Sequence, residues 1–71
     1  MRFLKRGSVV WASRWFVPGD HPRVEPHAGG SAIATPEGWR EVRPGDWILT
    51  DEAGTVWPMS DTQFRSLYAP A

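Results

Sequence analysis

The chain has 71 residues, of which eight are basic and eight acidic, so its formal net charge is zero, and it contains no cysteine. At this length a single domain buries only about 60% of its unfolded surface, so aromatic packing or self-association must add stability. The composition argues against duplex DNA as a partner and excludes disulfides and thiolate metal sites, and no apolar run approaches the ~20 residues needed to cross a membrane. We therefore expect one cytoplasmic domain over residues 1–71.

Residues 8–17 predict the first strand, because β-branched and aromatic side chains dominate and Pro18-Gly19-Asp20 ends the run. Alternation places Trp11 on one face and Arg14 on the other. Both faces are largely apolar, so the pattern leaves open which face is buried. Residues 18–30 are rich in proline and glycine and have no periodicity, which predicts a loop. The sequence leaves open whether this loop is ordered.

The middle of the chain predicts two short strands joined by a turn. Residues 31–35 form the first, Pro36-Glu37-Gly38 fits a β-turn, and residues 39–43 alternate as the returning strand. Pro44-Gly45 then suits a type II turn, because glycine accepts a positive φ. Asp46 can accept hydrogen bonds from nearby backbone amides, and residues 47–51, starting at Trp47, predict the next strand.

The C-terminal third predicts a hairpin and a capped helix. Gly54 is the natural left-handed residue of the hairpin loop, and Pro58 places residues 55–59 at a sheet edge. Ser60 opens a capping box for a helix over residues 60–68, whose apolar stripe of Phe64, Leu67 and Tyr68 must dock on the sheet. About five short strands and one helix predict a mostly β fold, a small SH3-like or similar five-stranded barrel or sheet.

Three segments resemble a family of small accessory proteins from tailed phages and prophages. That family begins with a Lys-Lys-Pro-Val-Val-Val-Glu-Ala-x-Gln-Trp-like strand and ends with Pro-Gly-Asp-Trp-Ile, Gly, Tyr-Pro, Phe and Tyr. The matching positions here are residues 5–15, the turn at residues 33–38, Pro44-Gly45-Asp46-Trp47-Ile48, Gly54, Trp57-Pro58, Phe64 and Tyr68.

The resemblance covers nearly the whole chain outside residues 18–30, and it implies an accessory protein acting inside a bacterial host. It supplies no catalytic residues. Trp11 stands where the family has Glu, Arg14 where it has Gln, and Trp57 where it has Tyr. A site or subunit contact at Trp11 would therefore be aromatic where the family's is acidic.

Tryptophan and arginine are the candidate binding residues. We expect Trp15, Trp47 and Trp57 to fill the core, whereas Trp11 and Trp39 are candidates for exposed stacking platforms or for an interface. Guanidinium groups bind phosphates bidentately, although pairing with nearby carboxylates is the ordinary alternative. The predicted ligand-binding residues are Trp11, Arg14, Trp39, Arg40 and Arg43.

No catalytic motif is present, so we expect no enzyme and no cofactor. His21, Glu25 and His27 are weak metal candidates on the predicted loop, because two imidazoles and a carboxylate could hold Zn²⁺. Their spacing matches no zinc signature, so we expect these three side chains to be solvated on the loop and to bind no metal.

These residues predict a non-enzymatic binding protein. The first hypothesis is that it sequesters a small anionic, nucleotide-type immune signal of the host, with sites between the subunits of a homo-oligomer. The second is a protein–protein module that inhibits or adapts a host or phage protein, since tryptophan and arginine dominate interface hot spots. The third is single-stranded nucleic-acid binding, which the zero net charge disfavours.

Overall fold

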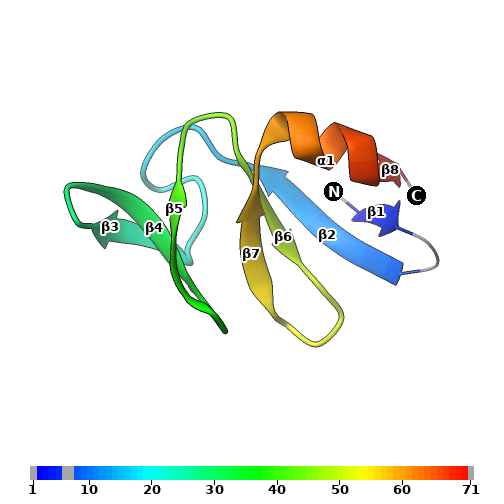
Figure 1. The fold of residues 1–71 in the computed structure, drawn as a ribbon, viewed down its shortest axis with the longest axis horizontal. Helices are drawn as coiled ribbons and strands as arrows, with labels where there is room; N and C mark the ends of the chain where they lie inside the picture. The colour runs from blue at the N-terminus through cyan, green and yellow to red at the C-terminus, as the bar shows by residue number, and fades with distance from the viewer. Residues whose placement is uncertain (1, 6–7, 71) are drawn as a thin grey trace.

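The computed structural model describes residues 2–5 and 8–70, with the side chains of residues 9–68. This part of the chain folds into two antiparallel sheets and one short helix (Figure 1). The first sheet has the strand order β7-β6-β2-β1-β8 and the second β3-β4-β5. The first sheet contains β1 (Arg2–Lys5), β2 (Ser8–Arg14), β6 (Trp47–Thr50), β7 (Val56–Met59) and β8 (Ala69–Pro70). The second contains β3 (Val24–His27), β4 (Gly30–Thr35) and β5 (Gly38–Val42), and helix α1 spans Asp61–Leu67.

The prediction of a mostly β fold with a short C-terminal helix is confirmed. The five-stranded SH3-like barrel is not confirmed, because the strands divide into two separate sheets. Strands β5 and β7 lie near each other (Figure 1), but they are edges of different sheets and are not hydrogen-bonded neighbours. Closure into a barrel would require a ladder of hydrogen bonds between β5 and β7.

The predicted loop over residues 18–30 is wrong in its second half, where β3 pairs with β4. Proline had argued against a strand, yet Pro26 lies on an edge strand, where its missing N–H costs no ladder bond. The first strand also ends earlier than predicted. Asp20 Oδ2 accepts the backbone N–H of Phe16 at 2.9 Å and of Val17 at 3.1 Å, and these bonds fold the chain into a turn after Arg14. Strands β1 and β8 were not predicted.

The turn at Pro44-Gly45-Asp46 is confirmed and joins the two sheets. Gly45 has φ 97°, and Asp46 Oδ2 accepts the Arg43 backbone N–H at 3.0 Å. Two backbone bonds then fasten the turn to the end of β2. The Trp15 N–H donates to Asp46 O at 2.8 Å, and the Gly45 N–H donates to Trp15 O at 2.7 Å. These bonds therefore hold the end of β2 next to the start of β6.

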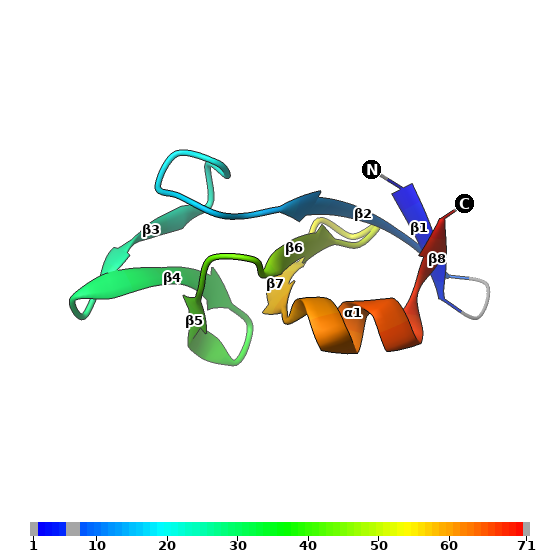
Figure 2. The ribbon, with the colours of Figure 1, turned by 90° about the horizontal axis from the view of Figure 1, so that it is seen from above.

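The first of two apolar clusters lies between the first sheet and α1 (Figure 2). It contains Val10, Ala12, Trp47, Leu49 and Phe64. Ser60 caps the helix as predicted, its Oγ accepting the Gln63 N–H at 3.2 Å. The predicted stripe is only partly correct, because Phe64 is buried and Tyr68 packs against the cluster, whereas Leu67 is 39% exposed.

The second cluster fills the space between the two sheets. It contains Trp15, Ile33, Val42, Ile48 and Val56. Ile48 and Leu49 are adjacent on β6 and belong to different clusters, because successive strand residues face opposite sides. Trp15 and Trp47 are core residues as predicted, and Trp57 is partly buried against the first cluster. Strand β6 is thus the buried centre of the fold.

Candidate functional site

Arg14 is occupied within the fold. Its Nε donates to Gly45 O at 2.6 Å, and its Nη2 lies 3.6 Å from Asp61 Oδ1. The guanidinium carbon also lies 5.2 Å from the ring centroids of Phe16 and Trp47. Arg14 therefore ties β2 to the Gly45 turn and to the start of α1, so its Nε and Nη2 are already engaged within the fold.

Asp61 is the centre of this connection. Its Oδ1 accepts the Trp47 indole N–H at 2.9 Å, and its Oδ2 accepts Arg65 Nε at 2.9 Å. The hydrogen bond from Trp47 and then that from Arg65 lower the pKa of the Asp61 carboxyl below its ordinary value. The carboxylate thus fixes the first turn of the helix to the sheet.

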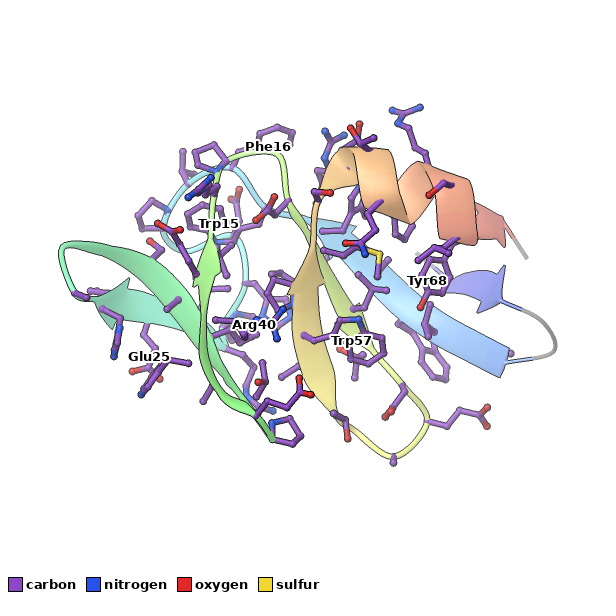
Figure 3. All side chains as sticks on the ribbon, viewed as in Figure 1. Trp15, Phe16, Glu25, Arg40, Trp57 and Tyr68 are labelled. Atoms are coloured by element: carbon purple, nitrogen blue, oxygen red, sulfur yellow. The ribbon has the colours of Figure 1, made fainter. Side chains whose placement is uncertain are left out.

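Arg40 and Arg43 are both paired with glutamates. Arg40 Nη1 donates to Glu37 Oε1 at 3.4 Å, and Glu41 Oε1 accepts Arg43 Nε at 3.1 Å and Nη2 at 2.9 Å. The two arginines line a hollow of about 250 Å³ between β5 and β7, where Figure 3 labels Arg40. Glu41 and Asp46 line the same hollow, so its charge is mixed rather than cationic.

The structure does not bring the five predicted ligand-binding residues together. Trp11 lies on β2 opposite Thr50, and Trp39 lies on β5 of the other sheet. Each indole is 46% exposed. Arg40 and Trp39 are adjacent on β5 and so point to opposite sides of their sheet. Arg40 and Arg43 line one hollow and Trp39 lines another, on the outer face of the second sheet; Glu41 lines both.

That outer face of the second sheet is the candidate site, and we call it the Trp39 face. The three strands present Glu25, His27, Ala32, Trp39 and Glu41 there, and Arg43, which follows β5, joins this face through its ion pair with Glu41. The register carries this assignment, because Ala32 pairs with Glu25 on one side and with Glu41 on the other, and paired residues point the same way. The opposite face of the sheet supplies Ile33 and Val42 to the core.

His27 and Trp39 stack with ring centroids 4.3 Å apart and an interplanar angle of 25°. His27 comes from β3 and Trp39 from β5, so the two rings reach toward each other across β4. Ala32 lies on β4 between them and is only 4% exposed, although its side chain faces outward. The small residues of the central strand therefore make room for an aromatic pair above them.

A hollow of about 250 Å³ adjoins this pair. It is lined by His27, Ala28, Gly30, Ser31, Ala32, Trp39 and Glu41. Sequence reasoning missed the role of His27, because residues 18–30 were assigned to a loop. The signal that could have found it is the alternation of Glu25 and His27 with Val24 and Pro26.

The weak metal candidates are not gathered. His21 Nδ1 accepts the Arg23 backbone N–H at 3.0 Å, and burial together with the Arg23 charge lowers the pKa of His21. His27 is stacked on Trp39. Among residues 2–5 and 8–70, no group of three or more His, Asp or Glu side chains is placed to hold a metal ion.

Comparison of the chain with protein-family models, curated proteins and solved structures finds no match. Within the described residues, no helix has the length and apolar character that crossing a membrane requires. The candidate site consequently rests on its geometry alone.

Proposed function

We propose that this chain is a non-enzymatic binding module that docks on a protein partner through the Trp39 face. The observation that carries the proposal is an indole 46% exposed to solvent, yet held in place by its stack on His27. An aromatic side chain fixed before binding loses little conformational entropy when the complex forms. Tryptophan and arginine are also the usual hot-spot residues of interfaces, and Arg43 lies on the same face.

The composition of the face supports a protein partner. The hollow beside Trp39 is lined by the carboxylate-bearing Glu41 as well as by small and apolar residues of β4. An apolar anchor surrounded by polar residues is the usual plan of a protein interface. The Glu41–Arg43 pair at 2.9 Å gives this face a charge of each sign, which favours a partner with complementary charges.

Sequestration of an anionic ligand remains the alternative hypothesis, and the ion pairs weigh against it. An anion at Arg40 or Arg43 must displace Glu37 or Glu41 and must tolerate Asp46 in the same hollow. Binding of single-stranded nucleic acid meets the same obstacle. The phage or prophage setting and the host cytoplasm stay predictions from the sequence resemblance.

Capture from bacterial lysate tests the proposal with three immobilised proteins: the wild type, Trp39→Ser and Leu67→Ser. Leu67 is the matched control, because it is also an exposed apolar side chain but lies on α1. We expect one partner on the wild type and on Leu67→Ser, with its affinity for Trp39→Ser reduced about thirtyfold, since a hot-spot residue contributes about 2 kcal/mol or more. Equal retention by Trp39→Ser would contradict the proposal.

Native mass spectrometry with a pool of nucleotides and cyclic oligonucleotides separates the alternatives. A discrete added mass on the wild type would favour ligand sequestration. The same spectra report the oligomeric state, for which a homo-oligomer remains our prediction. Substitution of Trp11 would test whether subunits associate through β2, because this side chain is exposed there, away from the Trp39 face.

A further inference from the structure

Another hollow, of about 360 Å³, lies on the first sheet near the C-terminal end of α1. It is lined by Val9, Val10, Asp51, Glu52, Ala53, Trp57 and Tyr68. None of these belongs to the Trp39 face. Trp57 extends from β7 and Tyr68 follows α1, as Figure 3 shows. The volume is at the low end of the range of small-ligand sites, about 300–1,000 Å³.

Both aromatic side chains are held by the fold. Tyr68 stacks on Phe64 with centroids 5.3 Å apart, and Phe64 stacks on Trp47 at 4.2 Å. Trp57 lies opposite Leu49 in the β6–β7 ladder and packs against the first apolar cluster. Burial raises the pKa of the Tyr68 phenol, so its ring is uncharged at neutral pH. The hollow thus has two neutral, electron-rich rings in its wall.

Two carboxylates of the β6–β7 hairpin, those of Asp51 and Glu52, also line the hollow. Asp51 Oδ1 accepts the backbone N–H groups of Ala53 and Thr55, both at 2.9 Å, which fixes the loop and the position of this side chain. Glu52 follows it and is exposed. Hydrogen bonds to Oδ1 leave the second oxygen of Asp51 to face other groups.

Neutral aromatic rings and carboxylates around one hollow are complementary to an organic cation. The face of a tryptophan or tyrosine ring attracts a nearby cation through the ring quadrupole, and a carboxylate adds ionic attraction. None of the described residues that line the hollow is cationic, and Asp51 and Glu52 would repel an anion. An aliphatic stem can lie against the apolar atoms in the wall of the hollow, as lysine and arginine stems do on apolar surfaces.

We propose that this hollow binds a primary ammonium or guanidinium group carried on an aliphatic stem, between the rings of Trp57 and Tyr68 and the carboxylates of Asp51 and Glu52. The cation has two chemical sources, a lysine or arginine side chain of a protein and a free polyamine. The site is separate from the Trp39 face and does not depend on the function proposed for it.

Titrations followed by ¹H–¹⁵N NMR test the site on the full chain. The probes are N-acetyl-arginine amide, N-acetyl-lysine amide, spermidine and the uncharged N-acetyl-norleucine amide. We expect saturable shifts of the Trp57 indole N–H and of the Glu52 and Ala53 amides with the cationic probes, weakening as salt is added. Absence of saturation with all three cations, or equal shifts with the norleucine derivative, would overturn the proposal.

Charge-removing variants locate the binding energy. Asp51→Asn keeps an oxygen that can accept the Ala53 and Thr55 bonds, and Glu52→Gln changes an exposed side chain, so both should fold. Each should weaken cation binding by up to about fivefold, the range of an exposed ion pair. Glu37→Gln is the matched control, since this exposed carboxylate lies in a different turn. Equal weakening by Glu37→Gln would show nonspecific charge attraction and refute the site.

The source of the cation follows from the ranking of the probes. Tighter binding of the arginine or lysine derivative assigns the site to a protein side chain, and tighter binding of spermidine assigns it to a free polyamine. Either ranking supports the shared chemistry. Failure of every cation to bind leaves partner capture through Trp39 unaffected, so the two proposals fail separately.

Discussion

Replacing Phe64 by alanine should remove a large part of the stability of this domain. Phe64 is 3% exposed and is the buried residue of α1, stacked at 4.2 Å on Trp47 and at 5.3 Å on Tyr68. A buried Phe→Ala substitution costs about 3–5 kcal/mol, and the lost ring pairs are included in that range. A domain of this size is stable by only about 4–11 kcal/mol, so the variant should be close to unfolding.

Urea denaturation followed by near-ultraviolet circular dichroism measures this cost. Phe64→Leu retains most of the apolar volume and should cost about 1–2 kcal/mol, which separates burial from ring stacking. Leu67→Ala is the matched control on the same helix and should cost less than about 1 kcal/mol, because Leu67 is already 39% exposed. Equal losses for Phe64→Ala and Leu67→Ala would refute the assignment of the buried helix face.

Three further predictions test contacts that connect the elements of the fold. Gly45→Ala should lower the free energy of unfolding in urea by about 1–2 kcal/mol, because Gly45 has φ 97°. Gly30→Ala is the control and should change the free energy of unfolding by less than about 0.5 kcal/mol, because Gly30 lies at a negative φ. Similar losses for the two variants would contradict the argument from backbone strain. Because folding lowers the pKa of Asp61, its carboxylate stabilises the fold at pH values above the ordinary pKa of 3.8, and this contribution is lost as the pH falls through the lower pKa of the folded state. The stability of Asp61→Asn should therefore differ most from that of the wild type near neutral pH. A difference that does not change with pH would contradict this prediction. Trp15→Phe should lower the urea midpoint of unfolding less than Trp47→Phe does. The buried Trp15 Nε1 has no acceptor among the described residues, whereas the Trp47 indole N–H donates to Asp61 at 2.9 Å. The reverse order of the two midpoints would contradict this prediction.

The pairing of the arginines is the reason that we propose a protein partner before an anionic ligand. From the sequence, Arg14, Arg40 and Arg43 look like a cationic group on neighbouring strands. In the fold, Arg14 contacts Asp61 and Gly45, and the other two pair with glutamates on their own hairpin. An unoccupied cationic surface needs a local excess of positive charge, and a chain with zero net charge has a carboxylate for each arginine of this set.

Local signals in the sequence were sufficient for the turns and caps. Ser60 caps α1, and Gly45 and Gly54 adopt the positive φ values of 97° and 85° that their turns demand. Pro58 lies in the edge strand β7. Each depends on backbone geometry and hydrogen bonds within a few residues, so the amino-acid types around it determine the outcome.

Tertiary pairing decided the rest. β3 forms where proline predicted a loop, because β4 offers a partner and an edge position tolerates Pro26. The stack of His27 on Trp39 joins strands on opposite sides of β4, and the contact of Arg14 with Asp61 joins the first long strand to the helix. The partition into two sheets also depends on which distant strands pair. Composition and periodicity describe each segment by itself, whereas these contacts join different segments: β3 and β4 meet through the short turn at Ala28 and Gly29, and Arg14 and Asp61 lie far apart in the chain.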